Sequence, residues 1–319
     1  MCSIVTRTAV WAFAHVPYRR DSPADTRKKA HSESVPTACW NAWDLLVNPR
    51  GIGWNWPRGL VVPKPAYETD SRVRFLLVSA ASAALNALAF DVCVQCVRAL
   101  GPDTFGTLQG GTLFDHTLPP ALEFVRAVCV AALLAGSAYF GVQYTHQLLA
   151  IVFVIVFQQH PSQWLPLFDA PWLSTSLGEL WGRRWHQMMR DMVLTLGAQP
   201  FSLLFGRLGG ILGAFVVSGI FHDIELRSGG RGGDAVALVG FWVMNGVGIV
   251  SERVWMRTTG WSVRGVWGRV WMVGWLLLWG VPMAEAYAKA GRFGALCLLG
   301  RFEPTRPVVE FVFSVFKQA

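Results

Sequence analysis

Two histidine-bearing stretches contain the residue types that could perform chemistry. The first, SLGELWGRRWHQMMRD (residues 176–191), holds two Trp, three Arg and one His, together with Glu179 and Asp191. The second, FVVSGIFHDIEL (residues 215–226), places His222 at the end of an apolar run, just before Asp223 and Glu225, either of which could fix its tautomer. A neutral imidazole suits a general base at neutral pH, because the unperturbed pKa of a histidine is about 6.5.

Both stretches also have an interpretation without chemistry. A helix over residues 177–190 would place Trp181 and Trp185 on one face, which is typical of an amphipathic helix at a membrane interface, with Arg near lipid phosphates. His222 could simply be hydrogen-bonded to a neighbouring carboxylate at a helix end. A histidine at membrane depth is costly, however, and indicates a functional site. His186 and His222 are 36 residues apart and are joined through one apolar span, which favours a shared role.

The composition indicates that a membrane surrounds these stretches. The chain has 319 residues, of which 53% are hydrophobic and 15% charged, and its mean hydropathy is +0.37. Soluble domains carry about a quarter charged residues. Sixteen Trp fit the same conclusion, because indole rings favour the membrane–water interface. The net charge of +8 is explained by basic loops at anionic lipid surfaces, so we expect no nucleic-acid partner.

The apolar runs predict an all-α polytopic membrane protein with about five full transmembrane helices plus re-entrant or interfacial helices. The run at 148–157 is too short to cross a bilayer alone, and the tail at 307–316 is also short. The Cys93-Val-Gln-Cys96 spacing lies in one of the apolar runs, so these thiols are predicted to be packing groups. The five predicted spans lie near residues 75–97, 121–144, 200–221, 235–251 and 268–287.

The distribution of charge predicts the topology and a division into two parts. The N-terminal segment and the loop at 253–269 are the most basic regions, so both are expected to face the cytosol. Both regions can face the cytosol only if residues 148–157 are not a full membrane crossing. With that count, the 176–191 stretch also lies on the cytosolic side. Residues 1–74 are predicted to be a polar cytosolic segment, mobile over 17–38, and residues 75–319 a membrane core. We find no pattern of a removed signal peptide.

The two stretches, in this order and spacing, resemble the wax-synthase-like branch of the membrane-bound O-acyltransferases. The block WDLLVNPRGIGWNW (residues 43–56) adds to the resemblance, which spans about residues 40–290 and is nearest to fungal members that acylate terpenoids and other secondary metabolites. The resemblance implies that His222 is the catalytic residue and that His186 stands where plant wax synthases have Asn. Relatives often carry Glu where this chain has Asp223.

The apolar helices expected ahead of the 43–56 block are largely missing, because the run at 8–16 is too short to span a membrane. We therefore expect either a short form of the protein or a truncated gene model.

The resemblance implies a multi-pass enzyme of the endoplasmic reticulum that moves an acyl group, expected to be acetyl, from acyl-CoA to a hydroxyl of a lipophilic acceptor such as a terpenoid. The alternatives are a long-chain wax-ester or sterol-ester synthase and a non-enzymatic, transporter-like membrane protein. Acyl-CoA is then a co-substrate, no permanently bound cofactor or metal is expected, and the partners are a lipophilic alcohol and membrane lipids. The oligomeric state stays open.

The remaining candidate residues follow from the chemistry of the first stretch. Arg183, Arg184 and Arg190 could bind the phosphates of acyl-CoA, although lipid phosphates are an equally good partner for each Arg alone. The thioester oxyanion needs hydrogen-bond donors, and the indole of Trp185 or the ring of His186 could supply one.

Overall fold

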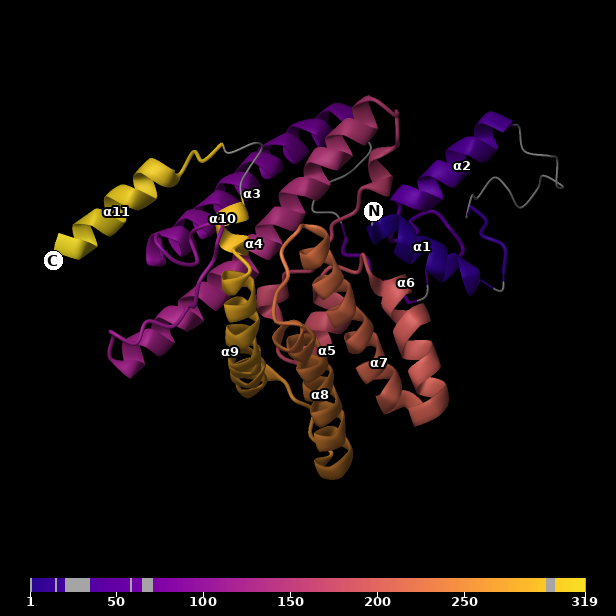
Figure 1. Cartoon of the computed structure of the whole chain (residues 1–319). Coiled ribbons are helices and arrows are strands. Elements are labelled where there is room, and N and C mark those ends of the chain that lie inside the picture. Colours follow the sequence, from indigo (N-terminus) through magenta and orange to yellow (C-terminus); the bar gives the residue numbers. More distant parts are fainter. Residues whose placement is uncertain are drawn as a thin grey trace. The chain divides into compact units, whose positions relative to one another are not determined.

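The computed structural model describes residues 2–14, 16–20, 35–57, 59–64, 71–296 and 302–318, and these residues form helices and loops with no strand (Figure 1). Four helical segments are long and apolar enough to cross a membrane, which confirms an all-α polytopic membrane protein. Most of the predicted mobile segment, residues 17–38, lies outside the described residues. The four segments are Arg72–Leu100 (α3), Pro120–Ile155 (α4), Arg190–Ser228 (α6 to α7) and Ala235–Thr259 (α8).

The fifth predicted span also forms a helix, α9 (Gly265–Lys289), but α9 is not among the four segments that meet the length and hydropathy of a membrane span. The shorter described helices are α1 (Cys2–Ala12), α2 (Val35–Val47), α5 (Leu177–Glu179), α6 (Arg190–Val193), α10 (Arg292–Ala295) and α11 (Arg306–Gln318).

The chain forms two compact units, and each is assembled from separate parts of the sequence. The first unit comprises the described residues of Met1–Pro65, Leu165–Ser218 and Gly246–Arg269. The second comprises those of Ala66–Trp164, Gly219–Asn245 and Val270–Ala319. The described residues of the N-terminal part therefore pack with segments from later in the chain.

The second unit is built on the antiparallel pair α3 and α4. Ser71 caps α3 by accepting a hydrogen bond from the Arg74 N–H. A side chain at Gly136 would lie 3.1 Å from the Cys93 sulfur, so this glycine allows the two helices to approach closely. Cys93 is buried in this contact, as a packing group would be.

The prediction of a separate short segment at 148–157 is wrong, because α4 continues through most of it as one helix of 36 residues. Two polar residues just ahead of this run make hydrogen bonds within the helix pair. The Thr145 hydroxyl donates to the Gly141 carbonyl at 2.8 Å, and the Gln147 amide donates to the Ser82 hydroxyl of α3 at 2.6 Å. Helix geometry is therefore retained across them.

A backbone break divides α7 (Gln199–Ser228). Gly206 adopts φ +65° and ψ −166°, a conformation that is almost restricted to glycine. Residues 207–228 beyond it form a helix about 33 Å long at 1.5 Å per residue, which is enough to cross the hydrocarbon core.

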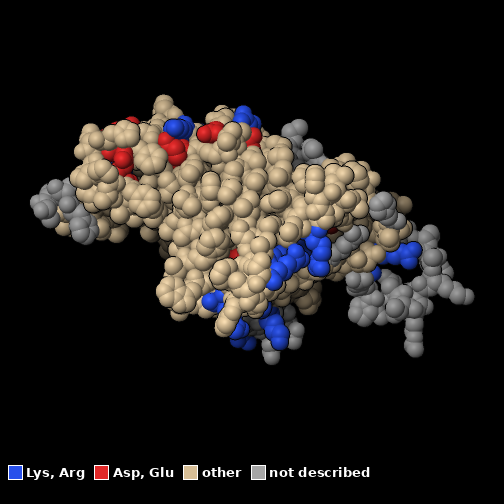
Figure 2. All heavy atoms as spheres, turned by 90° about the horizontal axis from the view of Figure 1, so that it is seen from below, with Lys and Arg blue, Asp and Glu red and all other residues tan. Residues whose placement is uncertain are grey.

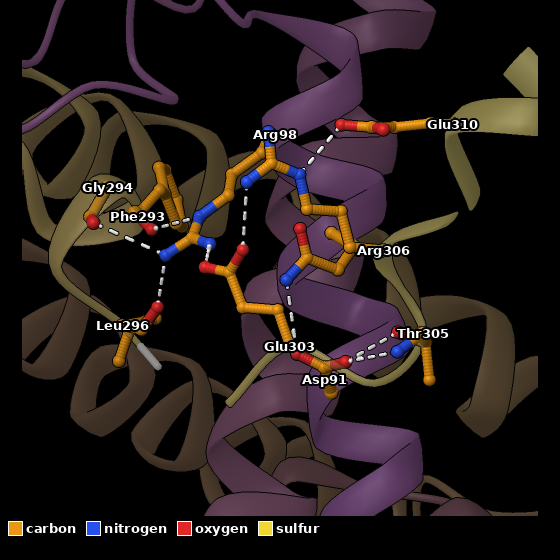
Figure 3. A network of polar contacts seen from close by, with 10 residues as sticks. Asp91, Arg98, Phe293, Gly294, Leu296, Glu303, Thr305, Arg306 and Glu310 are labelled. Carbon is orange, nitrogen blue, oxygen red and sulfur yellow. Dashed lines mark hydrogen bonds and ion pairs between the residues drawn. The ribbon is translucent and has the colours of Figure 1, made fainter. Parts of the chain in front are cut away.

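The C-terminal helix α11 is attached to α3 by a network of polar contacts within the second unit (Figure 3). The buried Asp91 carboxylate accepts hydrogen bonds from the Thr305 N–H at 2.8 Å and the Thr305 hydroxyl at 2.7 Å. Arg98 pairs with Glu303 and also donates to the carbonyls of Phe293, Gly294 and Leu296. These contacts explain how polar groups of a membrane helix are satisfied.

Candidate active site

The first histidine-bearing stretch is not the single helix that its periodicity predicts. Its helix starts at Leu177, widens to a π-helical turn over Leu180–Arg184 and ends at Trp185, whose ψ of 155° is extended. The Trp185 N–H donates to the Leu180 carbonyl at 2.8 Å, and helical geometry resumes only at Arg190. The expected helix over 177–190 is therefore wrong. π-Helical turns of this kind are common at functional sites.

A buried carboxylate from α8 caps this stretch. The two Glu252 oxygens accept hydrogen bonds from the Leu177 N–H at 2.7 Å and the Gly178 N–H at 2.9 Å. Close packing at the start of α9 adds a second contact, because a side chain at Gly268 would lie 2.2 Å from the Thr175 carbonyl oxygen. Glu252 thus accepts from two first-turn N–H groups, which have no partner within a helix.

The two arginines of the WGRR sequence have different surroundings. Arg184 donates to the Glu179 carboxylate at 2.6 Å and to the Asp169 carbonyl at 2.8 Å, and its side chain is 16% exposed. Arg183 contacts the Asp169 carboxylate at 3.1 Å and is 58% exposed. Arg184 therefore holds the turn together, whereas much of Arg183 remains available to a ligand.

The electrostatics of the turn reflect this arrangement. Burial alone would raise the pKa of the Glu179 carboxyl. Hydrogen bonds from Thr175 and Arg184 outweigh that effect and hold the pKa of Glu179 below its ordinary value. Glu179 is consequently an anion at neutral pH and a fixed partner for Arg184.

The aromatic residues of the stretch form a cluster. The Trp185 ring packs edge-on against Phe168, with centroids 4.9 Å apart, and against Trp181 at 5.6 Å. The His186 ring lies 5.6 Å from the same Phe168. Arg190 donates to the buried Gln187 side chain at 3.1 Å. The indole and the imidazole are therefore held in defined positions rather than spread along an amphipathic helix.

The upstream NPRGIGW block supports the same unit. The buried Arg50 donates to the carbonyls of Leu165 at 2.6 Å and Pro166 at 2.8 Å, just ahead of the histidine stretch. Burial lowers the pKa of the Arg50 guanidinium to about 10, so it stays charged at neutral pH. The Trp54 indole donates to the buried Asp44 at 2.7 Å. The block thus acts as a frame that positions the loop before the stretch.

The second histidine lies in the other compact unit, near the C-terminal end of α7. The His222 ring is stacked on the Trp242 indole of α8, with centroids 4.5 Å apart and planes inclined by only 2°. Its Nδ1 lies 3.5 Å from a Glu225 carboxylate oxygen, and the other Glu225 oxygen lies 3.9 Å from Arg292 of α10. The His222 side chain is 24% exposed.

The structure selects between the two acids that follow His222. Asp223, its neighbour in sequence, pairs instead with Arg227 at 2.7 Å. Glu225 lies one helical turn further on, on the same side as the imidazole. The sequence alone left both acids open and did not indicate Trp242, Arg292 or Glu252. An acid within the apolar run that ends α8 was the signal that could have indicated Glu252.

The candidate residues thus form two sets. Arg183, Arg184, Trp185, His186 and Arg190 lie together in the first unit, and His222 lies in the second. The first set offers cations and an indole beside an imidazole, which suits an anionic thioester substrate. The second offers an oriented imidazole with a carboxylate at one nitrogen, which suits proton transfer.

Comparison with known proteins gives one match that includes residues of both sets. Residues 164–243, which contain both histidines, match the model of the membrane bound O-acyl transferase family. The chain is 31% identical over 177 residues to acetyltransferase aurG of Calcarisporium arbuscula, a match covering 52% of this chain and 43% of that protein.

Two further relatives extend the comparison. Acetyltransferase ple2 of Rhodocybe pseudopiperita is 25% identical over 254 residues, which is 75% of this chain and 63% of the relative. The long-chain-alcohol O-fatty-acyltransferase of Simmondsia chinensis is 33% identical over 107 residues, with coverages of 31% and 30%. The matches therefore cover less than two thirds of the length of each of these relatives.

Proposed function

Because the chain belongs to the membrane-bound O-acyltransferase family, in its wax-synthase-like branch, we propose that it transfers an acyl group from acyl-CoA to the hydroxyl of a lipophilic alcohol. The observation that carries this proposal is the environment of His222. Its ring is stacked on Trp242, and one of its nitrogens faces the Glu225 carboxylate. Such an imidazole is oriented for proton transfer.

His222 acts as the general base in this proposal. The Glu225 carboxylate favours a proton on Nδ1, which leaves the lone pair of Nε2 to accept the proton of the alcohol. The alcohol oxygen attacks the thioester carbonyl and forms the new ester bond. The carbon–sulfur bond then breaks, and the CoA sulfur takes the proton from His222. The proton of the alcohol thus leaves with CoA, and no covalent intermediate with the enzyme is formed.

The first unit supplies the donor site in the same proposal. Arg183, Arg184 and Arg190 would meet the CoA phosphates, and His186 or the Trp185 indole would donate a hydrogen bond to the thioester oxygen as negative charge develops. Arg184 already holds Glu179 and Asp169, so the exposed Arg183 is the stronger candidate for a direct phosphate contact.

We propose acetyl-CoA as the donor and a terpenoid or similar secondary metabolite as the acceptor, in the membrane of the endoplasmic reticulum. Two of the relatives are named acetyltransferases, which supports the short acyl chain. The plant relative is named a long-chain-alcohol O-fatty-acyltransferase, which supports wax-ester synthesis as a second candidate. Parallel assays with acetyl-CoA and palmitoyl-CoA separate the two.

The test is the release of CoA by purified protein in detergent, given acyl-CoA and a panel of alcohols. His222→Ala should lose on the order of 10²–10⁴ in rate, as expected for removal of a general base, while the protein still accumulates. His186→Asn should be milder, because an amide still donates a hydrogen bond.

His116→Ala is the matched control, because His116 also lies beside a carboxylate, 3.0 Å from Glu123, but is 87% exposed in the loop before α4. Glu225→Gln should reduce the rate less than His222→Ala, since it weakens the orientation of the base without removing it. Normal turnover in His222→Ala would refute this mechanism. Equal and complete loss in the His222 and His186 variants would contradict their separate roles.

A further inference from the structure

A strongly basic surface lies in the first unit at the end of α8 and the start of α9. Arg253, Arg257, Arg264 and Arg269 are all exposed, and we call residues 253–269 the Arg–Trp segment. Three large aromatic side chains alternate with them, Trp255, Trp261 and Trp267, which are 53%, 71% and 83% exposed. Figure 2 shows basic side chains gathered on one face with little acidic surface between them.

These four arginines have no partner within the described part of the chain. None of them makes an ion pair or a side-chain hydrogen bond there. The nearest acid in the sequence, Glu252, is buried and already accepts the N–H groups of Leu177 and Gly178. The positive charge of the segment is therefore uncompensated and faces outward.

The segment is also held in shape. Gly260, at φ +76°, ends α8, and its N–H donates to the Met256 carbonyl at 3.0 Å. The Thr259 hydroxyl donates to the Trp255 carbonyl at 2.7 Å and accepts from the Trp261 N–H at 3.1 Å. The cations and indoles therefore occupy a defined surface and do not belong to a loose loop.

We propose that the Arg–Trp segment binds the headgroups of anionic phospholipids. Indole rings favour headgroup depth, and guanidinium groups hydrogen-bond to phosphate, so the alternation of the two fits a charged lipid surface. Exposed apolar neighbours, Val254, Met256 and Val266, are 44%, 48% and 76% exposed and would lie against the acyl chains.

Lipid bound at this segment would affect the proposed donor site, and this effect rests on the proposed function. Glu252 immediately precedes the segment and caps the turn at Leu177 and Gly178, while Gly268 packs on the Thr175 carbonyl. Glu252, just before the segment, and Gly268, near its last residue, thus contact residues that lead into Trp185 and His186. Anionic lipid that holds the segment in place would stabilise this turn and raise acyl transfer.

The test measures lipid retained by the full-length protein after purification from micelles that contain equal phosphatidylcholine and phosphatidylglycerol. We expect phosphatidylglycerol to be enriched at least about fivefold, the factor that one arginine contributes at an anionic surface, and the enrichment to fall as salt rises. Replacing all four arginines by Gln should bring the ratio to that of the added lipid, whereas replacing them by Lys should keep the enrichment because the charge remains.

Unchanged enrichment in the Gln variant would overturn the proposal. A weaker affinity for CoA with unchanged lipid enrichment would also overturn it, because the segment would then be a site for nucleotide phosphates. Should the fourfold Gln variant not fold, the pairs Arg253→Gln with Arg257→Gln and Arg264→Gln with Arg269→Gln give the same comparison. Lipid retention does not require turnover, so a protein inactive in every lipid would refute the proposed function while leaving this binding intact.

Discussion

Arg183 and Arg184 are neighbours in the sequence, yet their surroundings assign them different roles. The guanidinium of Arg184 connects the Glu179 carboxylate to the carbonyl of Asp169 and is mostly buried. Arg183 has one carboxylate partner and is 58% exposed. A doubly substituted protein would therefore mix a folding defect with any change in substrate binding, so the two positions have to be changed separately.

We expect Arg184→Gln to lower the free energy of unfolding by about 1–3 kcal/mol, because the half-buried Glu179 carboxylate and Asp169 carbonyl lose their charged donor. Arg183→Gln should instead raise the KM for acyl-CoA roughly tenfold, as expected for one charged hydrogen bond, and leave the KM for the alcohol and the unfolding temperature unchanged. Arg183→Lys is the control that retains charge. Equally lowered unfolding temperatures in the Arg183 and Arg184 variants would show that Arg183 also stabilises the turn and would contradict its role in binding acyl-CoA.

At the scale of the element, the break in α7 depends on one glycine. Gly206 has an almost glycine-only backbone conformation, and no atom lies within 4 Å of where a side chain would begin. Gly206→Ala should therefore reveal backbone strain alone, at a cost of about 1–3 kcal/mol in the free energy of unfolding, measured by thermal denaturation in detergent.

Gly240→Ala in α8 is its matched control, because Gly240 has equally open surroundings but lies within a regular helix. There Ala should be neutral or stabilising by up to about 1 kcal/mol. An unchanged unfolding temperature in Gly206→Ala would show that α7 is not broken at this residue.

The attachment of α11 to α3 should depend on pH. Burial alone would raise the pKa of the Glu303 carboxyl, but the hydrogen bonds and charges of Arg98 and Arg306 hold that pKa below its ordinary value. Because the folded-state pKa is lowered, the stabilisation is complete above the unfolded pKa of about 4.3 and is lost as the pH falls through the folded value.

Proteolysis at the C-terminus should therefore accelerate below about pH 4.3 in the wild type. Glu303→Gln should be cleaved faster at neutral pH and show a weaker dependence on acid. Glu310→Gln is the control, since Glu310 contacts only Arg306 in this network and is 62% exposed. Equal pH dependence in the wild type and Glu303→Gln would contradict this role of the carboxylate.

At the scale of the whole molecule, the topology can be tested from contacts within the first unit. Glu252 reaches the N–H groups of Leu177 and Gly178, so the end of α8 and the histidine stretch lie beside each other. The continuous α4 also removes 148–157 as a separate crossing. Both observations support the expectation that the two regions face the cytosol.

We expect Arg183→Cys and Arg264→Cys to react with an impermeant thiol reagent from the cytosolic side of sealed vesicles. Thr107→Cys, in the loop between α3 and α4, should react only from the opposite side. The labelling is best made in a protein whose native cysteines are replaced by Ser, because Cys39 and Cys129 are exposed. Labelling of positions 183 and 264 from opposite sides would refute this topology.

The sequence by itself determined the helical membrane class of the protein and indicated the two stretches that hold the candidate site. Long apolar runs must form helices in a bilayer because each backbone hydrogen bond has to be made locally, so the helical membrane fold could be predicted from composition and length. His222 could be found for a similar reason, since a polar side chain at membrane depth is conspicuous in the sequence.

Only the tertiary structure decided which partner each group has. Periodicity predicted a helix over 177–190, but capping by Glu252, remote in the sequence, accompanies a turn that ends at Trp185. The short apolar run at 148–157 predicted a separate segment, but Gln147 pairs with Ser82 and α4 continues. Similarly, Glu225 and Trp242 surround His222 while Asp223 pairs with Arg227. A polar group is satisfied by whichever donor or acceptor lies nearest in space, and sequence spacing does not fix that distance.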